Sequence, residues 1–159
     1  IIILIICNLY NIYIYNMNEI NIILDSNIEL DDSLITLKND KEIVFAAVTC
    51  DGRTLEFASD SLKKDRDIVM LAVMSNGISL EFASDSLKKE RDIVMAAVSN
   101  NGLSLKDACS DFQSDMEIVK SAVKNNGWSL QFASEDLKNN NEIVQIADEN
   151  QKDKLPFFY

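Results

Sequence analysis

A repeat of 25 residues runs through most of this 159-residue chain and constrains its fold more than any other feature. Residues 55–64 and 80–89 have the same sequence, LEFASDSLKK. The four glycines of the chain follow one another at intervals of 25 residues, at Gly52, Gly77, Gly102 and Gly127. Such periods are typical of arrays in which one supersecondary unit is stacked on the next copy of itself. We therefore expect the copies to stabilise one another.

The spacing of apolar residues predicts two helices in each copy. The first half of a copy places apolar residues at i, i+1, i+4 and i+5, which is one stripe of an α-helix, as in Ile43, Val44, Ala47 and Val48. The second half follows the spacing i, i+3, i+7, as in Leu55, Ala58 and Leu62. Isolated helices of about ten residues are marginal in water, so packing between copies must supply their stability.

A β-hairpin is the alternative structure for the unit. Asn76-Gly77 lies between apolar runs, which is a hairpin signal, and residues 78–82 alternate as a strand would. In the next copy Asp107 interrupts this alternation, whereas the helical spacing is kept by Leu105, Ala108 and Phe112. Alanine, lysine and glutamate are also poor strand residues. The pattern favours helices.

The residues between the apolar stripes predict how the helices begin and end. Each glycine is expected to end a helix in the left-handed conformation, which costs least without a Cβ atom. The second helix is then expected to start at a hydroxyl N-cap, namely Thr54, Ser79, Ser104 or Ser129. The other joint carries residues that mostly favour N-caps, namely Asp40, Asp65, Glu90, Asp115 and Asn140. The unit is thus predicted to be two ten-residue helices joined by a tight glycine turn.

The predicted fold is all-α, with tandem 25-residue helical hairpins stacked as a short α-solenoid. Residues 1–17 are an apolar leader that we expect to lie outside the fold, with Met17 as the expected start site. The array is expected over 18–150, with a degenerate first copy followed by repeats at 40–63, 65–88, 90–113 and 115–138. A terminal capping helix is expected at 140–150 and a tail at 151–159.

The repeated unit has the form D-x-D-I-V-x-x-A-V-x-x-N-G-x-S-L-x-F-A-S-x-x-L-K, which resembles the family described as domain of unknown function DUF4116. The stretches that match are Asp65 to Lys88, Glu90 to Gln113 and Asp115 to Lys138, with a partial copy at Asp40 to Lys63. The resemblance implies a tandem array of helices. It implies no activity, because none is assigned to that family, and so no functional residues are carried over.

The composition argues against catalysis and against metal or cofactor binding. Histidine, the commonest general base and metal ligand, is absent. The three cysteines, Cys7, Cys50 and Cys109, do not have zinc-site spacing. The chain carries no nucleotide-binding or nucleophile motif, and its acids recur at expected helix starts, where water keeps a carboxyl pKa ordinary. We expect no catalytic residue, no metal and no cofactor.

The charge and the apolar segments bear on the partners. A net charge of −11 opposes nucleic-acid binding, which depends on neutralising phosphates. The uncharged first 18 residues are interrupted by asparagines, so we expect no membrane span and a default location in the cytoplasm. One repeat position carries Phe45, Met70 and Met95 and then turns polar at Lys120 and Gln145.

That apolar row predicts either extra core burial or an exposed groove for a partner, since methionine suits an adaptable surface. Trp128 is likewise either a turn-packing residue or a binding anchor. The acids at Glu42, Asp67, Asp92, Glu117 and Glu142 are either helix-start electrostatics or a strip for a basic peptide.

Two functional hypotheses follow. The first is a non-enzymatic helical-repeat scaffold that binds an unknown protein or peptide. The alternative is an accessory repeat region of a larger enzyme or effector, whose catalytic part lies outside this chain.

Overall fold

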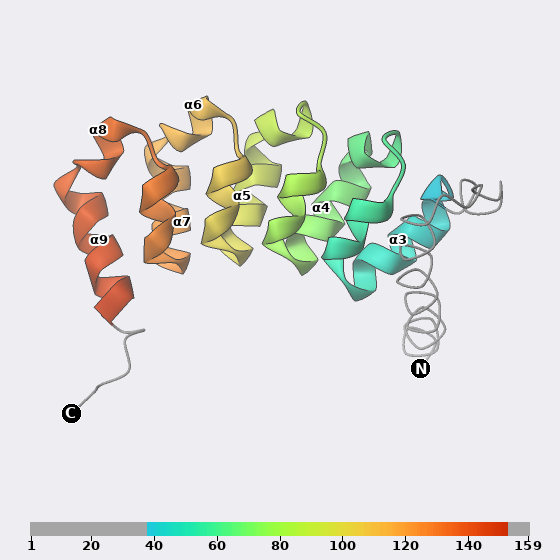
Figure 1. Cartoon of the computed structure of the whole chain (residues 1–159), viewed down its shortest axis with the longest axis horizontal. Coiled ribbons are helices and arrows are strands. Elements are labelled where there is room, and N and C mark those ends of the chain that lie inside the picture. Colours follow the sequence, from blue (N-terminus) through green and yellow to red (C-terminus); the bar gives the residue numbers. More distant parts are fainter. Residues whose placement is uncertain (1–37, 153–159) are drawn as a thin grey trace, which may run out of the picture.

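A computed structural model of the chain describes residues 38–152, which form a single row of stacked units (Figure 1). The expected leader, the degenerate first copy up to residue 37 and the tail from residue 153 lie outside the described residues. The described part is helical and contains no strand, which confirms the predicted all-α class and excludes the hairpin alternative over this range.

The units are arranged in two layers (Figure 1). One layer consists of parallel α-helices, each packed on the next: α3 (Lys41–Cys50), α4 (Arg66–Ser75), α5 (Arg91–Asn100), α7 (Met116–Asn125) and α9 (Asn141–Lys152). The other consists of 3₁₀ helices: η1 (Gly52–Phe57), η3 (Gly77–Phe82), η5 (Gly102–Asp107) and η6 (Gly127–Phe132). Short turns of helix join the layers at the upper edge: η2 (Leu62–Lys64), η4 (Leu87–Lys89), α6 (Ser110–Gln113) and α8 (Glu135–Lys138).

The core lies between the two layers and repeats with the sequence. In one copy the side chains of Ile68, Val69, Ala72, Val73 and Leu80 are fully buried. The first four come from the predicted α-helical stripe, and the leucine comes from the 3₁₀ helix that follows it. Each 3₁₀ helix packs on its own α-helix and on the α-helix of the next unit, so every unit helps to bury its neighbour.

Each of the five described α-helices begins directly after its predicted N-cap residue, and in four of them the side chain of that residue makes the cap bonds. The Asp65 carboxylate accepts hydrogen bonds from the backbone N–H groups of Asp67 (3.1 Å) and Ile68 (3.3 Å), and Asp40, Asp115 and Asn140 accept equivalent pairs. These bonds satisfy N–H groups that have no partner within the helix. Glu90 makes no such cap bond.

The predicted role of the glycines is wrong. None of Gly52, Gly77 and Gly102 has the positive φ of the left-handed region, and each begins a 3₁₀ helix after a residue in extended conformation. The reason for glycine is close packing between units. A Cβ atom on Gly77 would collide with the carbonyl oxygen of Ala97 and lie 2.8 Å from the backbone nitrogen of Asn101, both in the next unit. The missing side chain therefore sets how closely two units approach.

The predicted second α-helix is also wrong. The chain makes six residues of 3₁₀ helix, straightens at an alanine and then makes one more short turn. At Ala83 the backbone has φ −67° and ψ 152°, and the equivalent alanines are also extended. The backbone N–H of Ser84 then donates to the Lys63 carbonyl of the preceding unit (3.0 Å), so the interruption provides a bond between units.

The hydroxyl residues are not the N-caps of this second segment. Each 3₁₀ helix is capped by the residue before its glycine, as Asn76 shows by accepting a bond from the Ile78 N–H (3.2 Å). The predicted caps Ser79, Ser104 and Ser129 are buried instead. A Cβ atom on Gly52 would lie 2.9 Å from the Ser79 hydroxyl, so the serine fits where the preceding glycine leaves room.

Candidate interaction surfaces

The apolar row of the sequence, Phe45, Met70 and Met95, lies on one face of three neighbouring helices. The three side chains occupy equivalent positions on α3, α4 and α5, which pack in that order. Phe45 is 48% exposed, whereas Met70 and Met95 are half-buried and pack against the core. The row therefore combines the two predicted roles, since its inner side supports the core and its outer side is open to solvent.

The row ends where the sequence turns polar. At the equivalent position on α7, Lys120 forms an ion pair with Glu142 of the next unit. On α9, the Gln145 amide donates to Glu149 (2.9 Å). The apolar part of this face is thus limited to the first three described α-helices.

A shallow, open hollow of about 480 Å³ adjoins the row. It is lined by Met95 together with charged residues of the upper edge, namely Arg66, Glu90, Arg91 and Asp92. Within it Arg66 forms ion pairs with Glu90 (3.0 Å) and with Asp92. The hollow presents charges of both signs beside an apolar side chain.

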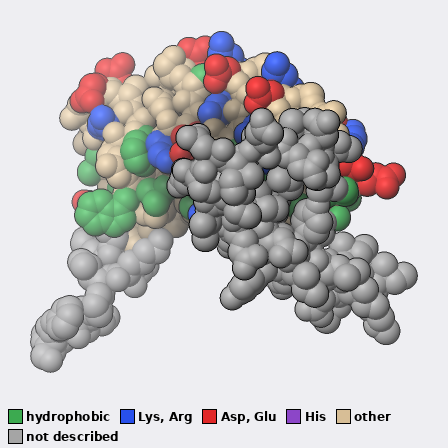
Figure 2. All heavy atoms as spheres, turned by 45° about the vertical axis from the view of Figure 1, so that its right-hand side comes forward, with side chains coloured by type: hydrophobic (Ala, Val, Ile, Leu, Met, Phe, Trp, Pro, Cys, Tyr) green, Lys and Arg blue, Asp and Glu red, His purple; other side chains and the backbone are tan. Residues whose placement is uncertain are grey.

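Three acids of the predicted ladder, Asp92, Glu117 and Glu142, form ion pairs with cations of the preceding unit, and so do the N-cap residues Asp65 and Asp115. Arg91 reaches Asp115 (2.5 Å) and Glu117 (2.6 Å) of the next unit, and Lys41 reaches Asp65 (2.7 Å). Figure 2 shows acidic and basic side chains side by side along the upper edge of the array. The acids therefore serve both the helix starts and the contacts between units.

These ion pairs shift the pKa values of their members. A hydrogen bond from Lys41 holds the pKa of Asp65 below its ordinary value, and Arg91 does the same for Asp115. Lys120 likewise lowers the pKa of Glu142. All three carboxylates are kept ionised, which is the reverse of what a general acid requires.

Trp128 lies apart from the methionine row. It is the second residue of η6, which packs on α7, α9 and η5, and its side chain is 64% exposed. An open hollow of about 340 Å³ beside it is lined by Gly127, Leu130, Gln131 and Lys138. The structure thus divides the four predicted partner-binding residues between two surfaces.

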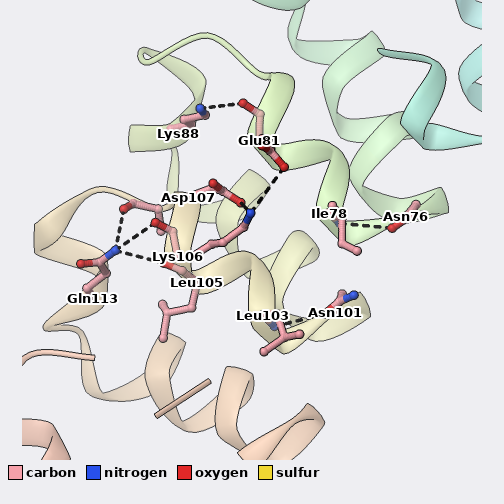
Figure 3. Close-up of polar contacts among 11 residues, drawn as sticks. Asn76, Ile78, Glu81, Lys88, Asn101, Leu103, Leu105, Lys106, Asp107 and Gln113 are labelled. Carbon is pink, nitrogen blue, oxygen red and sulfur yellow. Dashed lines mark hydrogen bonds and ion pairs between the residues drawn. The ribbon is translucent and has the colours of Figure 1, made fainter. Parts of the chain in front are cut away.

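The third described unit carries an acid where the others carry phenylalanine. Asp107 replaces the residue equivalent to Phe82, and its side chain is 15% exposed. Its Oδ2 atom is buried without a hydrogen-bond partner among the described residues, 3.8 Å from the Lys106 ammonium. Figure 3 shows Lys106 between Asp107 and Glu81. Burial raises the pKa of Asp107, with Glu81 adding to the rise.

Among residues 38–152, no three acids or cysteines lie together as a metal site would require. None of the described helices is both long enough and apolar enough to cross a bilayer.

A comparison with protein families identifies the repeat. The model of a family described as a domain of unknown function, DUF4116, matches residues 40–88, 65–113 and 115–157. The chain belongs to this family. No curated protein and no solved structure matches the chain. The third DUF4116 match continues beyond α9 into the residues after Lys152.

A ladder of side-chain amides joins the units of this DUF4116 array along its lower edge. The Gly77 N–H donates to Asn100 Oδ1 of the next unit (2.8 Å), and Asn100 Nδ2 donates to the Met74 carbonyl (2.9 Å). Asn125 and Asn150 repeat this arrangement. Each amide thus serves the end of one α-helix and the start of the following 3₁₀ helix.

The amide ladder is not among the features predicted above, although the sequence carries a signal for it. The repeat position at or near the end of α4, α5, α7 and α9 carries Ser75, Asn100, Asn125 and Asn150. At the first of these positions the Ser75 hydroxyl accepts a longer bond from the Gly52 N–H (3.2 Å).

Proposed function

We propose that this DUF4116 array is a non-enzymatic scaffold that binds another protein through the row of Phe45, Met70 and Met95. The observation that carries the proposal is the position of this row on three successive helices, with its outer side open to solvent. An exposed phenylalanine beside two flexible thioether side chains suits an apolar partner segment, because methionine adapts to irregular shapes.

The surroundings of the row favour a bound protein segment over a reacting small molecule. Two acids near the row, Asp65 and Asp115, are held ionised by hydrogen bonds from Lys41 and Arg91, and a carboxylate held ionised is a poor proton donor. The adjoining hollow is open and carries Arg66 and Arg91 beside Glu90 and Asp92. Such an arrangement suits polar contacts at the rim of an apolar interface.

The test is the double substitution Met70→Lys with Met95→Lys. Because Lys120 occupies the equivalent position on α7, the fold accepts lysine there and the variant keeps its helical circular dichroism. We expect it to lose the proteins that the unmodified chain captures, as measured by quantitative affinity capture and mass spectrometry.

The matched control is Gln145→Lys, which adds a charge at the same repeat position on α9, beyond the apolar row. This control should capture the same proteins as the unmodified chain. Equal capture by the double variant would show that the methionine row is not the binding surface.

A further inference from the structure

The last described unit leaves apolar side chains uncovered that are buried in the inner units. Leu130 of η6 is half-buried, whereas its equivalents Leu55, Leu80 and Leu105 are fully buried. Val144 of α9 is also half-buried, whereas Val69, Val94 and Val119 are fully buried. In the inner units the α-helix and 3₁₀ helix of the following unit pack on these positions.

The hollow beside Trp128 belongs to the same end of the array. Leu130 lines it together with Trp128. Figure 2 shows hydrophobic side chains at the lower edge of the array on the side of α9. We call Trp128, Leu130 and Val144 the end surface.

The residues after Lys152 start close to the end surface. Asn150 of α9 accepts a hydrogen bond from the Gly127 N–H (3.1 Å), next to Trp128 in the chain. An extended chain covers about 3.5 Å per residue, so Leu155 lies within roughly 10 Å of Lys152 and Phe157 within roughly 18 Å. The apolar residues of this segment therefore reach the end surface without any rearrangement of α9.

The sequence of this segment keeps the register of the repeat. Leu155 and Phe157 lie 25 residues after Leu130 and Phe132, and the DUF4116 match extends through residue 157. The segment also departs from the repeat. Lys152 replaces the glycine, and α9 has 12 residues where α7 has 10. The sequence of the segment thus keeps apolar residues at the positions that, in the inner units, cover the preceding unit.

We propose that residues 153–159 fold back and cover the end surface of the array, with Leu155 and Phe157 packing on Leu130 and Trp128. A solenoid needs its terminal apolar surface shielded, and this segment supplies the shield from the chain itself. Because the segment is tethered a few residues away, its effective concentration is about millimolar, so even a weak contact is populated.

Trp128 is the only tryptophan of the chain and reports on this contact directly. The experiment compares acrylamide quenching and the emission maximum of Trp128 in the full chain and in the double variant Leu155→Asp with Phe157→Asp. We expect the quenching constant of Trp128 to rise about twofold in the double variant, because acrylamide quenches by collision and reaches only the exposed part of the indole. The emission maximum should move to longer wavelength.

The matched control is Lys64→Glu, which changes the net charge by the same two units on η2, at the opposite end of the described array. It should quench as the unmodified chain does. The milder pair Leu155→Ala with Phe157→Ala removes apolar contact without adding charge, and should raise quenching in the same direction. Far-UV circular dichroism checks that each variant keeps its helices.

Two results would overturn the proposal. The first is quenching of Trp128 in the unmodified chain as strong as in both tail variants. The second is protection of Trp128 that appears only as protein concentration rises, together with a dimer in sedimentation. That result would assign the end surface to a second copy of the chain.

Discussion

Replacing Asp107 should stabilise the array, because this position holds a buried acid where the equivalent units hold phenylalanine. The same unit carries Phe112 where the others carry leucine, so the aromatic ring has moved from one position to the other along the chain. The informative variant therefore restores both residues, as Asp107→Phe with Phe112→Leu. The two single substitutions complete a double-mutant cycle.

The expected gain follows from the contacts of Asp107. Its Oδ2 atom is buried without a hydrogen bond, and removing such an oxygen is worth about 1–3 kcal/mol. A half-buried phenylalanine adds about 1 kcal/mol of apolar burial. Losing the 3.8 Å approach of Lys106 costs at most about 1 kcal/mol. We expect the double variant to unfold with a free energy about 2 kcal/mol higher near neutral pH.

The pH dependence distinguishes this cause from generally better packing. The pKa of Asp107 in the folded protein is raised above the ordinary 3.8, so the folded state binds this proton more tightly than the unfolded state. The cost of Asp107 is therefore full above its folded pKa and shrinks as the pH falls through that value. The stabilisation by the double variant should shrink likewise.

The assay is urea unfolding followed by far-UV circular dichroism at several pH values, with the unmodified chain measured in parallel. Comparing the two proteins at each pH cancels the other carboxyl groups that they share. If the double variant has an unchanged or lower free energy of unfolding near neutral pH, buried Asp107 does not destabilise the array. A gain independent of pH would refute the electrostatic cause.

Three further changes test the contacts between units. Gly77→Ala should cost about 3 kcal/mol in a thermal or urea melt, because its Cβ would collide with the Ala97 carbonyl; an unchanged melt would contradict the close approach. Asn100→Ala should lower the stability by about 1–3 kcal/mol in the same melts, and Asn100→Ser should lower it less. If both variants melt like the unmodified chain, the amide ladder does not stabilise the array. Arg91→Gln should raise the pKa of Asp115 in an NMR titration and reduce the stability lost as pH falls through its depressed value; an unmoved pKa would contradict the ion pair.

The sequence was sufficient for the class of fold and for the layer of α-helices. Within a repeat of this length, an apolar stripe such as Ile68, Val69, Ala72 and Val73 fits an α-helix that packs on its neighbours. All four residues are buried. The N-caps were also predictable. Asp65 or Asp115 before an apolar stripe acts through bonds to residues two and three positions later, which is a local interaction.

The second half of each unit was not predictable, because contacts between units decide it. Leu80 and Ala83 have a spacing that suits either an α-helix or a 3₁₀ helix followed by a break. The choice depends on the bond from the Ser84 N–H to Lys63 of the unit before, which no local pattern reveals. The amide ladder was missed for the same reason, since Asn100 ends one helix but acts on Met74 and Gly77 of another unit.

The sequence identified the candidate surface residues, but it did not show how they are arranged in space. Position in the repeat correctly grouped Phe45, Met70 and Met95, because equivalent residues of a stacked array must share a face. Trp128 belongs to a different repeat position, and it lies in η6, in the other layer.

The glycines show most directly that a repeated residue does not by itself reveal why that residue is required. A left-handed turn and a close approach of two backbones both require a residue without a Cβ atom, so both explain glycine at every copy. The two explanations differ in where the requirement lies. A turn acts within one unit, whereas Gly77 makes room for Ala97 of the next. The spacing of the array is therefore set by contacts between neighbouring units rather than within one unit.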